Sequence, residues 1–325
     1  MPWKYLMFPA MNTPRPLLTI IGDLCVDVTM GPISDWPEIG TETIMDEDEL
    51  RPGGSAANSA LAIRYIGSNC RLISLVGDDH FGQWLAGCFK NDMDTIVSCD
   101  KATTLSVCLT HSCSERTVFT TRGHLERMTA EHALNPLKPA KNPGDTVLLT
   151  GVYLLPELRP VYESLLRKIQ NAAYEIAIDT GWPSGGWCTE NRQEALSWLK
   201  YCGHLLINES EALGLAERKD LAETAEWIRS HMPENSRLVI KRGSRGAMGL
   251  NKKGMVSATA RPVEVRDSIG AGDTFNAGYL DACLNGAGLR DALEAGCNLA
   301  STVISRSPRN GIQAGELSRL AFQKH

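Results

Sequence analysis

The sequence predicts an α/β fold, in which helices cover both faces of a mostly parallel central sheet and a small β unit is added. Short segments that are apolar almost throughout recur along the chain, and segments with helical periodicity separate them. Strands of this character are typical of parallel sheets that are buried on both faces. Two other segments carry alternating, β-branched sequence without helical periodicity, which predicts the additional β unit.

Five apolar segments are the predicted strands of the central sheet. The first, residues 17–23, ends in Gly22 and Asp23. The others lie at 72–77, 146–151, 175–179 and 238–241, and the helical patterns between strands include 81–90, 158–173, 192–202 and 220–231. Ligands of such sheets bind beyond the carboxyl ends of the strands. The residues expected at that edge are Gly22, Asp23, Gly77, Asp78, Gly151 and Asp179.

The two segments of the small β unit are predicted at about 28–52 and about 104–122. Within the second, residues 105–111 and 115–120 are typical of a hairpin. Residues 1–16 contain prolines and no sustained apolar core, which predicts a flexible leader rather than a signal peptide. Residues 17–325 are then predicted to form one domain that includes the small β unit.

The composition excludes several classes of function. A net charge of −5 with scattered basic residues gives no reason to expect nucleic acid or an anionic membrane as a partner. No apolar stretch approaches the length that spans a bilayer. Ten cysteines without a framework spacing indicate small buried side chains in a reducing cytoplasm, and they argue against disulfides and a structural zinc site.

The most informative motif lies near the C-terminal end. Gly270, Ala271 and Gly272 carry no bulky side chains, and they precede Asp273 and an apolar helical pattern. A helix that begins in this way presents N–H groups at the positive end of its dipole, which is a pocket for an anion such as a transferring phosphoryl group. Asp273 would accept the proton of a hydroxyl that attacks the phosphorus. The alternative is a glycine-containing turn in which Asp273 only caps the helix.

A second motif is a helix that opens with glycines and ends at Gly67. Gly53 and Gly54 allow a ligand to approach the backbone closely, and Asn58 offers both a donor and an acceptor to a polyol. The alternative is that these small residues serve only close packing of the helix on the sheet.

Together with Gly67 and Gly77, these two motifs resemble the two signatures of the ribokinase-like (phosphofructokinase B type) carbohydrate kinases. The resemblance runs from about residue 17 to about residue 315. It implies a ribokinase-like fold whose small β unit is a lid over the sugar and pairs two subunits into a homodimer. It also implies transfer of a phosphoryl group from ATP, with Mg²⁺, to a hydroxyl, a primary one being the first choice. Ser268 stands where many members of the family have threonine, and it keeps the hydroxyl.

The resemblance also implies roles for residues outside the two motifs. Asp27 matches the position that hydrogen-bonds substrate hydroxyls beside Gly53, Gly54 and Asn58; the alternative is a strand-end turn. Asn208 and Glu211 match an Asn-x-x-Glu element that organises magnesium, its waters and the phosphates, although the same spacing is also a helix-capping arrangement.

The resemblance also implies one loop that binds the nucleotide and another that binds a monovalent cation. Lys241, Gly243 and Gly246 resemble the nucleotide loop of the family, and no Walker loop occurs in the chain. For Lys241, contact with phosphate and a solvated surface charge are both open. Asp267, with carbonyl groups near Gly311, corresponds to a monovalent-cation loop, which predicts possible activation by K⁺.

The substrate itself stays open. Residues 179–187 contain no arginine where some relatives that bind acidic sugars carry one, which favours a neutral hexose or pentose. Arg116, with Arg51, Arg122 and His124 in or near the lid, would instead bind an anionic sugar, or these are solvated charges. A nucleoside kinase of the same fold and a sugar-binding regulator without catalysis are the alternatives.

Overall fold

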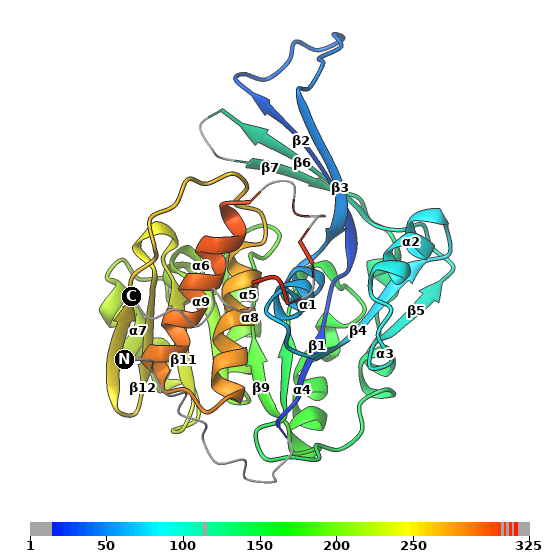
Figure 1. The fold of residues 1–325 in the computed structure, drawn as a ribbon. Helices are drawn as coiled ribbons and strands as arrows, with labels where there is room; N and C mark the ends of the chain where they lie inside the picture. The colour runs from blue at the N-terminus through cyan, green and yellow to red at the C-terminus, as the bar shows by residue number, and fades with distance from the viewer. Residues whose placement is uncertain (1–14, 113–115, 307–308, 310–311, 314, 318–325) are drawn as a thin grey trace, which may run out of the picture.

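The computed structural model describes residues 15–317 except 113–115, 307–308, 310–311 and 314. The chain forms a large sheet covered by helices, and a small sheet stands at one end of it (Figure 1). Most of the predicted leader and the predicted carbonyl ligands near Gly311 lie outside the described residues. None of the helices in the described part of the chain is long and apolar enough to cross a membrane.

The large sheet confirms the predicted mostly parallel architecture. Its spatial order is β13-β12-β11-β10-β9-β8-β1-β4-β5, and only the pairs β11/β12 and β12/β13 are antiparallel. The strands are β1 (Leu18–Ile21), β4 (Cys70–Gly77), β5 (Thr95–Cys99), β8 (Thr146–Leu149), β9 (Glu175–Ile178), β10 (His204–Asn208), β11 (Arg237–Lys241), β12 (Ala247–Asn251) and β13 (Gly254–Ala258).

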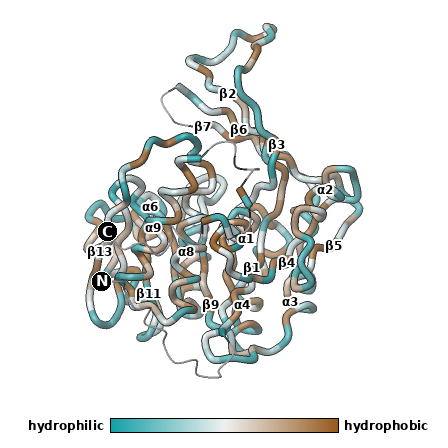
Figure 2. Tube along the Cα trace, in the orientation of Figure 1, coloured by the Kyte–Doolittle hydropathy of each residue, from teal (hydrophilic) through white to brown (hydrophobic). Residues whose placement is uncertain are grey.

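Two hydrophobic cores lie on the two faces of this sheet, because successive strand residues point to opposite sides. Leu206 belongs to one core, while its neighbours Leu205 and Ile207 belong to the other. The first core is covered by α1 (Ser55–Tyr65), α2 (His80–Cys88), α8 (Ala271–Leu284) and α9 (Leu289–Ile304). The second is covered by α3 (Ala130–Leu134), α4 (Tyr162–Asn171), α5 (Thr189–Leu199), α6 (Glu209–Ala216) and α7 (Leu221–Ser230). Figure 2 shows hydrophilic loops around these cores.

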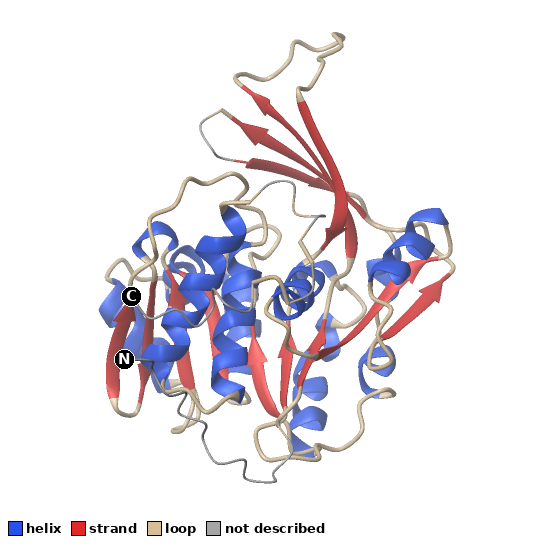
Figure 3. Cartoon of the chain, viewed as in Figure 1, coloured by secondary structure: helices blue, strands red, loops and turns tan. Residues whose placement is uncertain are grey.

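The small sheet consists of the two segments predicted for the additional β unit. Its order is β3 (Glu47–Gly53), β2 (Cys25–Ile33), β6 (Leu105–His111) and β7 (Arg116–Thr120). The pair β6/β7 is the predicted hairpin. This sheet rises from the large sheet next to the N-terminus of α1 (Figure 3). Short 3-10 helices at His124–Arg127, Val152–Leu154, Arg159–Val161 and Gly243–Arg245 complete the chain.

Candidate active site

The N-terminus of α8 is formed by the glycine-rich motif. Gly270 has a φ of +71°, a backbone conformation that favours glycine, and α8 begins at Ala271. A Cβ atom at Gly270 would lie 2.9 Å from Nδ2 of Asn58 in α1. Glycine is therefore required here both for the turn and for the close approach of α1. The first turn of α8 is where the anion pocket is predicted. The N–H of Ala271 donates a 3.3 Å hydrogen bond to the carbonyl oxygen of Ser268 across the turn that precedes α8.

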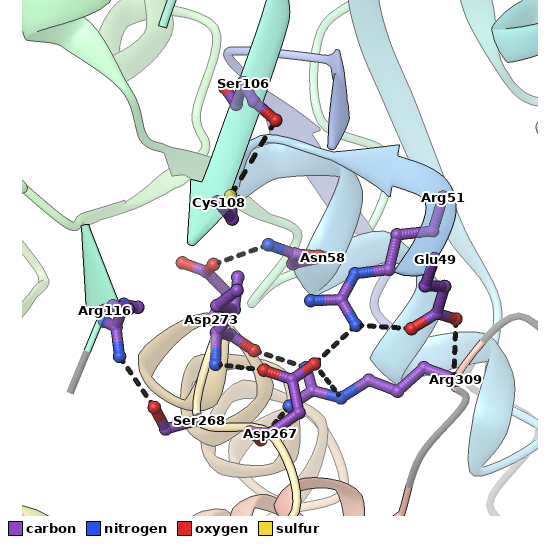
Figure 4. Close-up of polar contacts among 11 residues, drawn as sticks. Glu49, Arg51, Asn58, Ser106, Cys108, Arg116, Asp267, Ser268, Asp273 and Arg309 are labelled. Atoms are coloured by element: carbon purple, nitrogen blue, oxygen red, sulfur yellow. Dashed lines mark hydrogen bonds and ion pairs between the residues drawn. The ribbon is translucent and has the colours of Figure 1, made fainter. Parts of the chain in front are cut away.

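Asp273 lies in the first turn of α8, and its side chain is partly accessible. Asn58 Nδ2 donates a hydrogen bond of 3.1 Å to Asp273 Oδ2 (Figure 4). Burial raises the pKa of Asp273 to about 7, the negative charge of Asp179 adds to the rise, and the positive charge of Lys241 opposes it. A carboxylate with a pKa near neutrality is suited to accept and return a proton.

A largely buried cation, Lys241, lies beside this helix start. Lys241, at the end of β11, places Nζ 2.7 Å from Asp179 Oδ2 and donates a hydrogen bond of 3.3 Å to Asn276 Oδ1. Asn276, in α8, donates a 2.6 Å hydrogen bond to the same oxygen of Asp179. Burial opposes the charge of Lys241, but Asp179 and then Glu211 more than compensate and raise its pKa. Lys241 is therefore not a solvated surface charge.

Asn208 and Glu211 form the capping arrangement that the sequence left as an alternative. Asn208 Oδ1 accepts the N–H of Glu211 at 2.8 Å, and Glu211 Oε2 accepts the N–H of Asn208 at 2.7 Å. This cap fixes the Glu211 carboxyl group, which is buried, at the carboxyl end of β10. Burial and the nearby Asp179 raise the pKa of Glu211 to about 7, against the effect of Lys241. Capping and a role at the site are thus compatible.

Asp27 lies within β2, so the alternative of a strand-end turn is wrong. Its side chain is buried against the backbone of Gly53, where an added Cβ would lie 2.0 Å from the carboxyl group. Cys25 Sγ donates a weak 3.5 Å hydrogen bond to Asp27 Oδ1. Burial raises the pKa of Asp27 to about 6, although Arg51 opposes the rise. The carboxyl group therefore retains hydrogen-bonding capacity for other groups.

A comparison with models of protein families identifies the family of this chain. The model of the pfkB family carbohydrate kinases matches residues 17–311. The chain belongs to this family. Two similar relatives are a ribokinase of Bacillus subtilis, 25% identical over 87% of this chain and 91% of that protein, and a fructokinase of Salmonella typhimurium, 27% identical over 77% and 83%.

Solved structures confirm the ribokinase-like fold of this pfkB kinase. A ribokinase of Thermotoga maritima, at 18% identity, superposes with a TM-score of 0.75 over 95% of this chain and all of that one. A ribokinase of Arabidopsis thaliana, solved with ribose and ATP, also has 18% identity and a TM-score of 0.75, over 96% of this chain and all of that one. An adenosine kinase of Sinorhizobium meliloti, at 20% identity, has a TM-score of 0.79 over 95% of this chain and all of that one.

In this pfkB kinase the four charged residues that the sequence analysis singled out in or near the predicted lid have different surroundings. Arg116, in β7, donates a 2.9 Å hydrogen bond to Ser268 Oγ, so it reaches the turn before α8. Arg51 is buried in ion pairs with Glu49 and Asp267. The remaining two do not face the site: Arg122 is almost fully exposed beside Glu126, and His124 is buried with Nδ1 accepting the N–H of Thr104.

The predicted nucleotide loop of the pfkB kinase follows β11. Gly243 and Gly246 both have positive φ values, and a Cβ at Gly246 would lie 2.0 Å from the carbonyl oxygen of Ala258. These glycines are therefore required by the local backbone, whatever they bind. Arg245 pairs with Glu209 at the start of α6.

Three further residues hold the site together: the sequence placed Asp23 and Asp179 at the binding edge without a role, and it missed Asn276. Asp23, at the end of β1, accepts the N–H of Ser55 at 2.9 Å at the start of α1. Asp179 and Asn276 hold Lys241. The signal that placed both acids at the binding edge is that each follows an apolar strand. Asn276 carried no separate signal, because it lies within a continuous helical pattern.

Proposed function

We propose that this chain transfers the terminal phosphoryl group of ATP to a hydroxyl group of a sugar or sugar derivative. The observation that carries the proposal is Asp273, a carboxyl group with a pKa of about 7 in the first turn of α8. In the proposed step the Asp273 carboxylate takes the proton of the hydroxyl, whose oxygen forms a bond to the terminal phosphorus. The bond from that phosphorus to the bridging oxygen breaks, and ADP leaves. A primary hydroxyl is our first choice.

The charge of the phosphates would be compensated by groups already in place. The N–H groups of Gly270, Ala271 and Gly272 would donate hydrogen bonds to the oxygens of the transferring group, with that of Ala271 shared with the carbonyl oxygen of Ser268. Lys241 lies beside Gly272. Gly243 and Gly246 would border the nucleotide.

Magnesium fits the chemistry of this edge. Glu211 supplies a buried carboxyl oxygen, and Asn208 holds it in position. No group of three His, Cys, Asp or Glu side chains within the described residues forms a metal cage, and Mg²⁺ needs none, because it keeps several waters and uses substrate phosphates. Bound with ATP, the ion would neutralise phosphate oxygens, with Glu211 holding it through water.

The sugar would bind between α1 and the small sheet. Asp27 would accept hydrogen bonds from two hydroxyls, and Asn58 would orient a third beside Asp273. Gly53 and Gly54 would leave room for the ring at the start of α1.

A neutral pentose or hexose is our first choice of substrate, supported by the ribokinase and the fructokinase among the relatives. Arg116 favours an anionic sugar as the second choice, because its guanidinium is already at the turn before α8. A nucleoside comes third, supported by the fold shared with an adenosine kinase. A regulator without catalysis is disfavoured by the complete set of Asp273, Lys241 and Glu211.

We also propose that the protein is cytoplasmic and that two copies pair through the small sheet. The exposed apolar side chains of Val118 and Phe119 in β7, and of Trp36 in the loop after β2, support the pairing.

A panel assay tests the function directly. ADP release is measured with magnesium-ATP and neutral sugars, sugar acids, sugar phosphates and nucleosides. We expect release with neutral sugars. Release with sugar phosphates or sugar acids alone would give Arg116 the substrate role, and release with nucleosides alone would replace the sugar in the proposal.

The assignment of Asp273 is tested with Asp273→Asn, for which we expect a loss of about a thousandfold in kcat with unchanged affinity for ATP. Asp291→Asn, an exposed acid in the first turn of α9, is the matched control and should keep full activity. Wild-type turnover in Asp273→Asn would show that another group is the base.

The same variant also predicts a stability effect with a defined sign. Because the pKa of Asp273 is raised from 3.8 to about 7, the wild type loses stability as the pH rises through that window. Asp273→Asn does not titrate, so the Tm difference in its favour should grow between pH 5 and pH 8. A difference that shrinks would contradict the raised pKa.

A further inference from the structure

The guanidinium of Arg309 binds the turn that precedes α8. Arg309 Nη2 donates to the carbonyl oxygen of Asp267, and Nη1 donates to the carbonyl oxygen of Ile269. Arg309 Nε lies 3.3 Å from Asp267 Oδ2, and the side chain is only 7% exposed. One planar cation therefore contacts two backbone oxygens and the carboxylate of the same turn, immediately before Gly270.

Both carboxylate oxygens of Asp267 already have partners. Its Oδ1 accepts the N–H of Ile269 at 2.8 Å, and its Oδ2 lies 2.5 Å from Arg51 Nη1 in addition to Arg309. Glu49 completes the network: it lies 3.0 Å from Arg51 Nη1, and it accepts the backbone N–H of Arg309 at 2.8 Å. Two carboxylates and two guanidiniums thus compensate each other in a buried cluster (Figure 4).

This arrangement does not fit a monovalent metal ion at the Asp267 loop. Such an ion needs several oxygen ligands, and here the carbonyl oxygens of Asp267 and Ile269 and the Asp267 carboxylate already face guanidiniums. An added K⁺ would also lie against two positive charges in a buried place, where repulsion is strong. A neighbouring cavity of about 30 Å³ is lined by both Arg51 and Arg309, which suits a water molecule and not a cation.

We propose that the Arg309 guanidinium is a built-in cation that fixes the anion-binding turn, so that this kinase works without a monovalent metal ion. Arg309 is a positioning residue. It orders the turn from Asp267 to Gly270, and it places a positive charge next to this turn. Burial lowers the pKa of Arg309 to about 10, so the group stays charged at neutral pH. The proposal rests on the proposed phosphoryl transfer at this turn.

The wild-type enzyme gives the first test. Its kcat and its Tm are measured in KCl and in tetramethylammonium chloride at equal ionic strength. We expect values that agree within about twofold in rate and show no K⁺-dependent rise in Tm. A rate several-fold higher in KCl, or a Tm that rises specifically with K⁺, would overturn the proposal.

The variant Arg309→Ala gives the second test. We expect its rate in tetramethylammonium chloride to fall by about 100-fold, because the turn loses its support, and K⁺ or guanidinium ion to restore part of the rate and of the Tm. Arg266→Ala removes an exposed arginine one residue before Asp267, and it should behave as wild type in both salts. A full rate for Arg309→Ala in tetramethylammonium chloride contradicts the proposal. An equal response of that variant to both salts would also do so, since it would leave Arg309 a purely structural role.

Two measures keep the test decisive. Should Arg309→Ala fail to fold, Arg309→Lys keeps the charge but loses the fork that spans two carbonyls, and it is compared in the same salts. The cation question and the proposed function are also separable: without ADP release from any sugar, the proposed function fails. The comparison of wild-type Tm and ATP affinity in the two salts would still decide whether a metal cation binds.

Discussion

At the scale of single residues, the pKa of Asp273 depends on its burial and on the charges around it. Burial is the main cause of the raised pKa of Asp273; Asp179 raises it further and Lys241 lowers it, while these two also pair with each other. The carboxyl group is thereby balanced close to neutrality, where its proton can be both taken up and released. Asp179 and Asn276 hold Lys241 beside the start of α8, where its positive charge would face the phosphates in the proposed reaction.

This balance predicts two opposite changes in the pH profile. Asp179→Asn removes a negative charge, so the pKa of Asp273 should fall and the acidic limb of kcat/KM should move to lower pH by about one unit. Lys241→Met removes a positive charge, so that limb should move to higher pH. The measurement is kcat/KM against pH for both variants. Shifts in the same direction would mean that another group controls the limb.

The sequence predicted the contiguous motifs of the candidate site but not the cluster of residues that meet only in the folded chain. Gly270 to Asp273 and Gly53 to Asn58 were predictable because each motif is contiguous and its backbone requirement is local. The cluster of Arg309 with Glu49 and Arg51 was not, because its members are far apart in the sequence and meet only in the folded chain.

At the level of elements, all five predicted apolar strands are present in the large sheet, whereas its strands β5, β10, β12 and β13 were not among them. Strands β5 and β13 are at the two edges of the large sheet, and both expose side chains to solvent. They lack the continuous apolar character of central strands for that reason. Strand β12 contains Gly249, which packs closely under Leu289 and Leu293 of α9, and glycine weakens the strand pattern.

The two ends of α8 give a matched prediction. Gly270 and Gly286 both have positive φ, but nothing lies near a Cβ at Gly286, whereas one at Gly270 meets Asn58. Gly286→Ala should therefore lower the free energy of unfolding by about 1 kcal/mol and keep full activity. Gly270→Ala should cost at least as much and also lower kcat/KM, because Asn58 must move away from Asp273. Denaturant unfolding and kinetics measure both. Equal activity of the two variants would remove the link.

At the level of the whole molecule, the small sheet carries an exposed aromatic group. The Trp36 ring lies 5.9 Å from the ring of His111 and 6.2 Å from that of Phe119, and Trp36 and Phe119 are each more than half exposed. If two copies pair through this sheet, the aromatic group becomes buried.

The pairing predicts that Phe119→Glu yields a monomer, since the interface would then hold an unpaired charge. Met255→Glu, which changes an exposed apolar residue on β13, should leave the dimer unchanged. Sedimentation velocity of both variants and the wild type measures this. A wild type that sediments as a monomer at high concentration would rule out the pairing.

The small sheet is joined to the anion-binding turn through both of its edge strands. Arg51 of β3 holds Asp267, and Arg116 of β7 holds Ser268. A sugar that tilts the sheet would therefore move or tighten the turn that receives the phosphates. Thermodynamic reciprocity then requires that any factor by which the sugar strengthens ATP binding is matched by the factor by which ATP strengthens sugar binding. The two ligands would act as each other's effectors without any third site.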